Sequence, residues 1–316
     1  MNSKEIVVVV VLYKRKVEES QTINSLAAAF GSSPELLDCM RILLWDNSPN
    51  AIDRLDLPFA CDYRHADRNV GTSGAYNYAM EFAETEGASW LLLLDQDTTV
   101  SGKFLPRMLE YSHLLQEQTE IGSVVPFICS HGSLVSPRLL GRFHQMPQIA
   151  ATFNGICRRK AFAVNSATLM RVAALREIGG YSVDFWLDLS DIYVFQAMYR
   201  MGRYLYVAGD LLLEHSVTNM NFDGDMAPER YRNFLAAEGA YVDLYSSVPE
   251  RAVHLLRLLA RTIRQRRRHR KKIFSRMTWE YFRRRLLDTR AQRLQSWRKQ
   301  LVLRDIPAMK DGRPVG

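Results

Sequence analysis

An apolar run that ends in two acids constrains the fold of this chain most strongly. Residues 90–94 read Trp-Leu-Leu-Leu-Leu, and Asp95-Gln96-Asp97 follows directly. An uninterrupted apolar run of this length predicts a strand that is buried on both faces, as in a parallel sheet. Open parallel sheets bind ligands beyond the carboxyl ends of their strands, so both carboxylates are expected at a ligand-binding edge. The alternative is an ordinary strand-end turn in which Asp97 caps the next segment.

Strand and helix patterns alternate along much of the sequence. The predicted strands are residues 6–12, 41–45, 62–65, 90–94, 121–127, 161–165 and 204–207. The predicted helices are residues 17–30, 75–86, 170–178 and 192–201. This alternation predicts a doubly wound α/β fold, with a mostly parallel sheet and flanking helices. Residues 121–165 are crowded with Gly, Pro, Ser and His, and long irregular connections are often functional loops.

The charge of the chain is divided unevenly. Residues 251–300 hold 18 Lys and Arg against two acids, Glu280 and Asp288, so this segment carries +16 although the whole chain carries +8. We therefore predict two regions with different roles: an acidic α/β domain over residues 1–225 and a helical, strongly basic region over residues 226–316.

The cysteines and the apolar stretches indicate the cellular compartment. None of the four cysteines belongs to a C-x-x-C pair, so neither a zinc site nor a disulfide framework is predicted, and a reducing cytosol fits best. Residues 6–12 are apolar, but no small-residue cleavage site follows them, so we interpret them as a strand and not as a signal peptide. No stretch approaches the roughly 20 apolar residues of a membrane span.

Five segments carry polar residues in a characteristic order: residues 8–13, 44–48, 68–77, 94–97 and 179–191. Their order and spacing resemble the family 2 glycosyltransferases of bacterial surface-polysaccharide synthesis. Asp95-Gln96-Asp97, together with residues 185–191, is most similar to the rhamnosyltransferase branch. The resemblance covers residues 5–220. It implies a GT-A fold, a nucleotide-sugar donor, a divalent metal ion and inversion at the anomeric carbon.

The two carboxylates suit a hard cation on their own chemistry, because Mg²⁺ and Mn²⁺ prefer oxygen ligands and also bridge phosphates. The resemblance implies that Asp97 binds the metal directly and that Asp95 contacts the ribose or supports the metal. It also implies that His215 completes the metal site or contacts phosphate. The alternative for His215 is a structural role beside the apolar run that precedes it.

The remaining donor contacts are predicted at the ends of early strands and at a helix start. Tyr13 is suited to stacking on a pyrimidine, and Asp46 to accepting a hydrogen bond from the base or ribose. Gly71 and Gly74 permit close backbone approach at a helix N-terminus, and Arg68 is suited to pairing with phosphate. The alternatives are a surface tyrosine at position 13 and a plain helix start at Gly71.

An inverting displacement needs a base for the acceptor hydroxyl. The segment 184–191 supplies Asp184, Asp188 and Asp191. The resemblance implies that Asp191 is the base and that Asp188 is a second acid of the site. The alternative is that Asp188 or Asp191 caps a helix starting near Ile192, since aspartate is a favoured N-cap residue.

The basic region combines an apolar stripe at helical spacing with arginines and scattered aromatic residues. Basic amphipathic helices of this kind suit an anionic membrane surface, so we predict that residues 251–300 bind one. The resemblance implies a lipid-linked glycan acceptor, which fits a cytoplasmic protein peripheral to the inner face of the bacterial plasma membrane. The alternative is a helical appendage that packs on the body of the protein or on a second subunit. A nucleic-acid-binding arm is the less favoured third interpretation.

These predictions describe a metal-dependent glycosyltransferase that moves a hexose, L-rhamnose from dTDP-rhamnose, onto a lipid-linked glycan in O-antigen or capsule synthesis. A transferase for another UDP-sugar is the first alternative. A sugar-phosphate nucleotidyltransferase is a second, although residues 13–16 lack the glycines expected after its first strand. The third is a non-catalytic protein that binds nucleic acid through the basic region.

Overall fold

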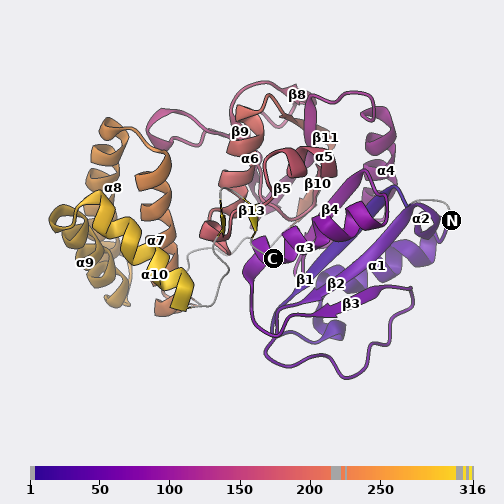
Figure 1. Ribbon diagram of the computed structural model, residues 1–316, viewed down its shortest axis with the longest axis horizontal. Helices are drawn as coiled ribbons and strands as arrows, with labels where there is room; N and C mark the ends of the chain where they lie inside the picture. The colour runs from indigo at the N-terminus through magenta and orange to yellow at the C-terminus, as the bar shows by residue number, and fades with distance from the viewer. Residues whose placement is uncertain (1–3, 215–221, 225, 304–308, 311–312, 315–316) are drawn as a thin grey trace. The chain divides into compact units, whose positions relative to one another are not determined.

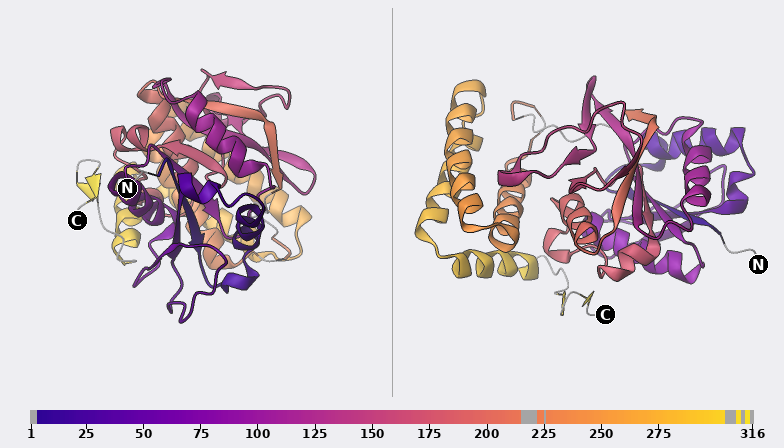
Figure 2. Two further views of the ribbon diagram at one scale, coloured as in Figure 1. Left: turned by 90° about the vertical axis from the view of Figure 1, so that its right-hand side faces the viewer. Right: turned by 90° about the horizontal axis from the view of Figure 1, so that it is seen from above.

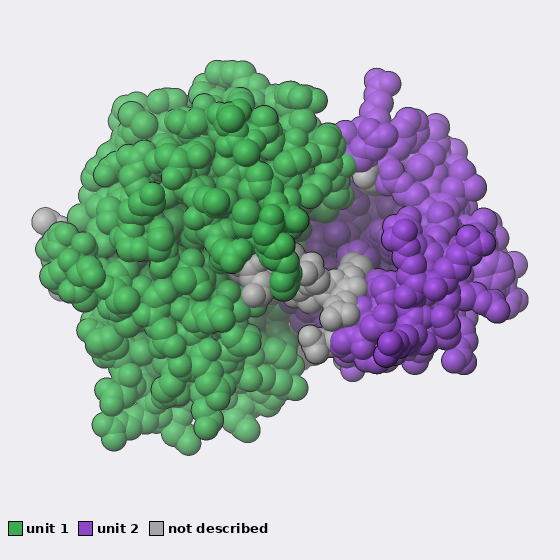
Figure 3. Space-filling model, turned by 180° about the vertical axis from the view of Figure 1, so that it is seen from behind, with its two compact units in different colours: residues 1–140, 146–182, 190–216 green, residues 141–145, 183–189, 217–316 purple. Residues whose placement is uncertain are grey.

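The computed structural model describes residues 4–214, 222–224, 226–303, 309–310 and 313–314 of the chain. Contacts between residues divide the chain into two compact units, which Figure 3 colours separately. The first comprises residues 1–140, 146–182 and 190–216, and the second comprises residues 141–145, 183–189 and 217–316. We call them the α/β unit and the helical unit.

Within the described residues, nine strands form the central sheet of the α/β unit (Figure 1). They are β1 (Ile6–Leu12), β2 (Met40–Asp46), β3 (Asp62–His65), β4 (Trp90–Asp95), β5 (Ile121–Ser130), β6 (Ser133–Ser136), β8 (Gly155–Cys157), β10 (Thr168–Arg171) and β11 (Tyr204–Glu214). The order is β3-β2-β1-β4-β10-β5-β11-β8, and β6 pairs with β5. The pairs β2–β3, β1–β2, β1–β4 and β5–β11 are parallel, whereas β10 runs antiparallel to β4 and β5. The predicted doubly wound, mostly parallel sheet is confirmed.

Helices cover both faces of this sheet (Figures 1 and 2). They are α1 (Gln21–Ser32), α2 (Leu36–Cys39), α3 (Gly71–Thr85), α4 (Phe104–Leu114), α5 (Val172–Glu177) and α6 (Ser190–Arg200). The steps from β1 to β2 and from β3 to β4 run in opposite directions along the sheet. Because such crossovers are right-handed, α1 and α3 lie on opposite faces. Every residue of β1 is therefore buried, which explains its unbroken apolar run.

The structure corrects three of the predicted elements. The helix predicted over 170–178 begins only at Val172, because Met170 belongs to strand β10 and pairs with Leu91 on one side and Ser123 on the other. The helix predicted over 17–30 is a 3-10 turn (Val17–Glu19) followed by α1. The strand predicted over 161–165 is limited to β9 (Ala161–Phe162), which pairs with β7 (Arg138–Leu139).

The helical unit contains α7 (Pro228–Tyr245), α8 (Val248–Arg268), α9 (Ile273–Leu287) and α10 (Arg290–Leu303). One apolar cluster joins α7, α8 and α9 through Phe222, Met226, Tyr231, Leu235, Leu258 and Phe274. A second cluster packs the segment 183–189 against α7 and α10 through Val183, Trp186, Ala237, Ala240, Trp297 and Leu301. The predicted basic, helical C-terminal region is therefore present. No helix in the described part of the chain is long and apolar enough to cross a membrane.

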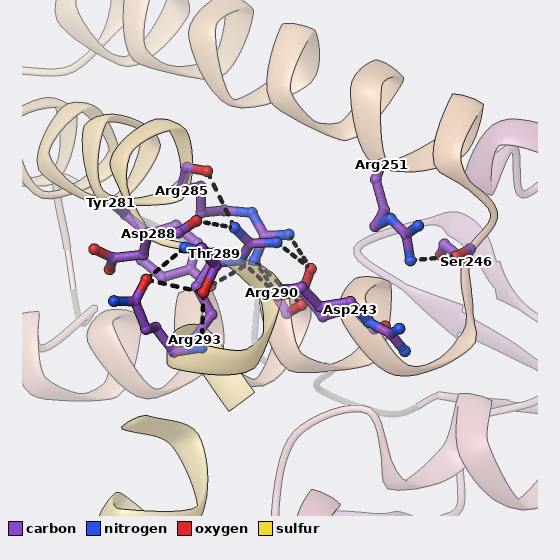
Figure 4. A network of polar contacts seen from close by, with 11 residues as sticks. Asp243, Ser246, Arg251, Tyr281, Arg285, Asp288, Thr289, Arg290 and Arg293 are labelled. Carbon is purple, nitrogen blue, oxygen red and sulfur yellow. Dashed lines mark hydrogen bonds and ion pairs between the residues drawn. The ribbon is translucent and has the colours of Figure 1, made fainter. Parts of the chain in front are cut away.

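Some arginines of the basic region point inward rather than to solvent. Asp243 on α7 is 1% exposed and forms ion pairs with Arg285 (2.9 Å) and Arg293 (2.8 Å), as Figure 4 shows. Arg261 pairs with Glu238 at 2.6 Å. These contacts tie α8, α9 and α10 to α7, so part of the positive charge stabilises the unit itself.

Candidate active site

The predicted acids lie at the carboxyl edge of neighbouring parallel strands. Leu12 of β1 is in register with Asp46 of β2, and Val11 of β1 is in register with Asp95 of β4. Asp46 and Asp95 therefore end the two strands that flank β1. The sheet positions them as expected for a ligand-binding edge.

The Asp95-Gln96-Asp97 turn is held by the start of α1. The Thr22 hydroxyl shares its one proton between the carbonyl oxygens of Asp95 and Thr98 (2.9 Å to Thr98), and it accepts from the Thr98 amide (2.9 Å). The Ser20 hydroxyl donates to the carbonyl oxygen of Gln96 (2.8 Å). Ser20, Thr22 and Thr98 are fully buried, so the turn is fixed by contacts that water does not reach.

A pair of buried tyrosines lies beside the carboxylates. The Tyr76 hydroxyl donates to Oδ1 of Asp95 at 3.0 Å, and the Tyr76 ring packs 5.1 Å from that of Tyr181. Burial, with the charges of Asp95 and Asp191, raises the pKa of both tyrosines well above the usual value. The tyrosines are therefore protonated at neutral pH, and the Tyr76 hydroxyl donates to Asp95.

Asp191 is the second residue of α6. Its Oδ1 accepts a hydrogen bond from the Ile192 amide at 2.8 Å. The helix begins at Ser190, so the carboxylate lies in the first turn and not before the helix. The helix dipole favours negative charge at this position.

Asp184 and Asp188 have different surroundings from Asp191. Both belong to the helical unit, whereas Asp191 belongs to the α/β unit. Asp188 forms an ion pair with Arg230 of α7. Burial raises the pKa of Asp184. Asp188 is therefore held by a charged partner within the helical unit.

Asp95 and Asp97 fit a divalent cation by the chemistry of their ligand atoms. Both side chains are half-buried at the strand edge, and both offer carboxylate oxygen. Among the described residues, no group of three His, Cys, Asp or Glu side chains is arranged to hold a metal, and His215 lies outside those residues. Mg²⁺ usually binds through one or two carboxylates together with substrate phosphates and water, so two carboxylates suffice.

Tyr13 and Asp46 occupy the predicted nucleoside side of the edge. Tyr13 follows β1 and is 41% exposed, and its amide donates to Oε1 of Gln96 at 2.9 Å. Asp46 is fully buried, and its two oxygens accept from the Ser48 amide (2.8 Å) and the Tyr63 hydroxyl (2.9 Å). Burial, together with the hydrogen bond to Asp46, raises the pKa of Tyr63 to about 12. Asp46 thus organises the edge from inside, while the Tyr13 ring is part-exposed, with Nζ of Lys14 lying 5.2 Å from its centroid.

The predicted glycines begin α3. Gly71 has a φ of +70°, and a Cβ at Gly74 would lie 2.6 Å from the Cβ of Val70. Asn47 ties the end of β2 to this turn, accepting from the Val70 amide (3.2 Å) and donating to the Gly71 carbonyl (3.0 Å). The helix start itself therefore requires both glycines. Arg68, just before it, is exposed.

Sequence reasoning missed several buried residues that hold the site. Asn77 donates to the Tyr181 carbonyl (2.9 Å) and accepts from the Tyr181 amide (2.7 Å). Asn165 and Ser166 contact α6 and the Asp95 turn from the loop before β10. A partial signal existed, because this loop ends the irregular stretch of residues 121–165.

Comparisons with known proteins agree with this architecture. A family model described as Glycosyl transferase family 2 matches residues 7–179. None of the curated proteins matches the chain.

Solved structures of TarS from S. aureus are similar at low identity. One TarS structure aligns at 14% identity over 84% of this chain and 44% of that chain, with a TM-score of 0.46. TarS 1–349 aligns at 13% identity over 88% of this chain and 91% of that chain, with a TM-score of 0.47. TarS 1–349 in complex with UDP-GlcNAc aligns at 14% identity over 79% and 70%, with a TM-score of 0.46. The aligned region thus spans less than half of the longest of these chains. These values do not bear on the substrates of the present chain.

Proposed function

Since the chain belongs to glycosyl transferase family 2, we propose that it is an inverting enzyme that takes a sugar from a nucleotide-sugar donor. Its α/β unit has the GT-A fold. The observation that carries the proposal is a series of buried contacts that starts at Asp95 of β4. It runs through Tyr76, Tyr181 and Asn165 to Ser190, the residue before Asp191 in α6. One acid thus belongs to the Asp95-Gln96-Asp97 turn on the donor side, and the other lies in the first turn of a helix.

On the donor side, Asp97 and Asp95 would hold Mg²⁺ or Mn²⁺, with His215 as a further proposed ligand. A bound cation of this kind neutralises the charge of the departing diphosphate. The Tyr13 ring would stack on the nucleobase, and Asp46 would keep the strand edge in place or contact the nucleoside. Arg68 and the backbone at Gly71 and Gly74 would contact phosphate.

On the acceptor side, Asp191 would accept the proton of the acceptor hydroxyl. The freed oxygen attacks the anomeric carbon while the bond from that carbon to the diphosphate oxygen breaks, so the configuration inverts. The products are the glycosylated acceptor and a nucleoside diphosphate. Asp188, paired with Arg230, would fix the chain that leads into α6 rather than take the proton.

For the sugar, we propose L-rhamnose from dTDP-rhamnose, on the strength of Asp95-Gln96-Asp97 and residues 185–191. The alternative donor is a UDP-sugar. The acceptor would be a lipid-linked glycan of O-antigen or capsule synthesis. Family membership favours a glycosyltransferase over a sugar-phosphate nucleotidyltransferase and over a non-catalytic nucleic-acid-binding protein.

We propose that an exposed basic face of α9 binds an anionic membrane. Arg276, Trp279, Arg283 and Leu286 recur at helical spacing and are all exposed, with Trp279 at 42% and Leu286 at 58%. Neither arginine has a side-chain partner in the described part of the chain. Arginines around an exposed tryptophan suit the interface of anionic lipids. This face would hold the cytoplasmic enzyme at the inner leaflet of the plasma membrane, near a lipid-linked acceptor.

A donor screen tests the proposed function. The purified protein is mixed with Mn²⁺ and UDP-, dTDP- or GDP-sugars, and thermal unfolding is followed. The donor that raises the melting temperature is then tested for transfer to a synthetic polyprenyl-diphosphate-linked sugar. We expect one nucleotide class to stabilise the protein and its sugar to be transferred with inversion. Stabilisation by no nucleotide, with or without Mn²⁺, would contradict the proposal.

A further inference from the structure

Ser166 holds the donor-side turn from a separate part of the chain. Its hydroxyl accepts from the Asp95 amide at 2.8 Å and shares a hydrogen bond with the Thr98 hydroxyl at 2.5 Å. Ser166 is 1% exposed, and Thr98 is fully buried. The loop before β10 therefore grips both ends of the Asp95-Gln96-Asp97 turn.

Asn165, the preceding residue, holds the start of α6. Its side-chain amide donates to the Ser190 hydroxyl oxygen at 3.0 Å, and its Oδ1 accepts from the Tyr181 hydroxyl at 3.1 Å. Ser190 is the first residue of α6 and precedes Asp191. All three partners of this contact are buried, so the hydrogen bonds are not exchanged for bonds to water.

The loop that carries these two residues is itself fixed. The Ala167 amide donates to the Leu93 carbonyl of β4 at 2.7 Å, and the Thr168 amide donates to the Asn165 carbonyl at 3.1 Å. Ala167 has a φ of +65°, in the left-handed region. Two adjacent residues of one fixed loop thus contact both the Asp95-Gln96-Asp97 turn and the start of α6, where Asp191 lies.

We propose that Asn165 and Ser166 are positioning residues that lock the Asp95-Gln96-Asp97 turn and the first turn of α6 into one rigid assembly. This inference rests on the proposed function, in which the turn binds the donor and Asp191 takes the acceptor proton. An in-line displacement depends on how the base and acceptor are placed against the donor, and a shift of about 1 Å can cost about a hundredfold in rate. Asn165 and Ser166, which we call the bridge, fix that placement through side chains that touch neither substrate.

The test uses variants that remove one hydroxyl group and add no volume. Ser190→Ala removes the contact of Asn165 to α6, and Tyr181→Phe removes the hydrogen bond that Asn165 accepts from Tyr181. Ser166→Ala releases the donor turn. For the first two we expect kcat to fall about tenfold or more, because misplacement acts on the chemical step, while nucleotide affinity in Mn²⁺ changes less than about twofold. For Ser166→Ala we expect weaker nucleotide binding as well.

Two comparisons separate positioning from simple loss of stability. Tyr111→Phe is the matched control, because Tyr111 is a buried tyrosine on α4 of the same unit, and its hydroxyl donates to Asp210 of β11 at 2.5 Å. Its melting temperature should fall with kcat unchanged. Ser190→Thr restores the hydroxyl and should recover kcat. A loss of kcat in Tyr111→Phe equal to that in Tyr181→Phe would overturn the proposal.

Amide hydrogen exchange tests the bridge without relying on turnover. In Ser190→Ala, exchange at residues 95–98 should accelerate although the change lies on the α6 side, because the two sites share one loop. Unchanged exchange at residues 95–98 would overturn the bridge even if the enzyme were active. Faster exchange with no transferase activity towards any donor would support the bridge and contradict the proposed function.

Discussion

The hydroxyl of Tyr76 donates a hydrogen bond of 3.0 Å to Oδ1 of Asp95, joining the buried face of α3 to the carboxyl end of β4. Tyr76 is fully buried, and burial with the neighbouring charge of Asp95 raises its pKa well above the usual value. It is therefore a protonated donor at neutral pH. The contact orients one carboxylate of the proposed donor site.

Tyr76→Phe removes this donor without changing the shape of the core. A hydrogen bond to a charged group is worth about 1.5–3 kcal/mol, so we expect nucleotide affinity in Mn²⁺ to fall by about tenfold or more. Isothermal titration calorimetry measures this directly. Tyr111→Phe is the control and should bind nucleotide as the wild type does. Equal nucleotide affinity in wild type, Tyr76→Phe and Tyr111→Phe would contradict a role for the Tyr76 hydroxyl in donor binding.

Asp191→Asn should abolish transfer while leaving donor binding near normal. A positioned general base typically contributes about 10²–10⁴-fold, and the amide cannot accept the proton. Initial rates at saturating donor and the nucleotide dissociation constant are measured side by side. Asp210→Asn, which changes an acid of the same unit paired with Arg107, is the control. Near-normal turnover of Asp191→Asn would show that another group is the base.

Gly180→Ala should destabilise the α/β unit. Gly180 has a φ of +78°, and an added Cβ would lie 2.5 Å from Oδ1 of Asn77, the atom that accepts from the Tyr181 amide. The left-handed backbone and the displaced Asn77 together should cost about 1–3 kcal/mol. Gly31→Ala, where a Cβ meets nothing within 4 Å, is the control and should be neutral or slightly stabilising. Equal melting temperatures for the two variants would contradict this role of Gly180.

Asp243→Asn should destabilise the helical unit at neutral pH. It leaves Arg285, which is almost fully buried, without its charged partner, and breaking a buried pair costs about 3–5 kcal/mol. Urea denaturation followed by far-ultraviolet circular dichroism gives the free energy of unfolding. Arg158→Gln, which breaks an exposed pair with Glu120, is the control and should change the free energy of unfolding far less, because water screens exposed pairs.

The same pair predicts a pH dependence. Burial alone would raise the pKa of Asp243, but hydrogen bonds from Arg293 and Arg285 lower it below the ordinary value of 3.8. The stabilisation that ionised Asp243 adds to the folded state is therefore complete above pH 3.8. It is lost as the pH falls through the lowered pKa of Asp243. The raised pKa of Asp184 acts in the opposite direction, so wild type and Asp243→Asn are compared at each pH. Their difference in unfolding free energy should shrink on acidification, and a constant difference would contradict the assignment.

The α9 face predicts binding to anionic vesicles. Wild type should sediment with phosphatidylglycerol vesicles and not with pure phosphatidylcholine. Arg276→Glu combined with Arg283→Glu should weaken binding at least tenfold, since each charge near the surface is worth about 1 kcal/mol. Lys103→Glu, an exposed reversal in the α/β unit, is the control. Unchanged sedimentation of the double variant would contradict membrane binding by this face. If the wild type is a dimer and the double variant is a monomer, the face is a subunit interface instead.

Much of the fold follows from local sequence pattern. The apolar runs of β1 and β4 are long and uninterrupted because both faces of the sheet are covered, and turn residues mark their ends. The helix predicted over residues 170–178 started too early because β10 leads directly into α5. The apolar residues Leu169 and Met170 of the strand continue into the helix and give the periodicity of a longer helix. Met170 is extended because it pairs with β4 on one side and with β5 on the other, and these pairings cannot be read from the local sequence.

The candidate site was less predictable than the fold. The acids at the strand edge could be predicted, since the strand pattern places them there. The residues that hold them could not, because the Ser166 contact to Asp95 and the Asn77 contact to Tyr181 join distant parts of the chain. The burial of Arg285 could not be predicted either, because it depends on an ion pair with Asp243 of another helix.

The central claim is that Asp95 and Asp97 bind a nucleoside diphosphate through a divalent cation. Calorimetric titration of UDP and dTDP, with Mn²⁺ and then with excess EDTA, tests it on wild type, Asp97→Ala and Asp191→Asn. The account predicts that one nucleotide binds to wild type and to Asp191→Asn only when Mn²⁺ is present, and that Asp97→Ala does not bind it. Equal binding to wild type in EDTA and to Asp97→Ala in Mn²⁺ would contradict the account.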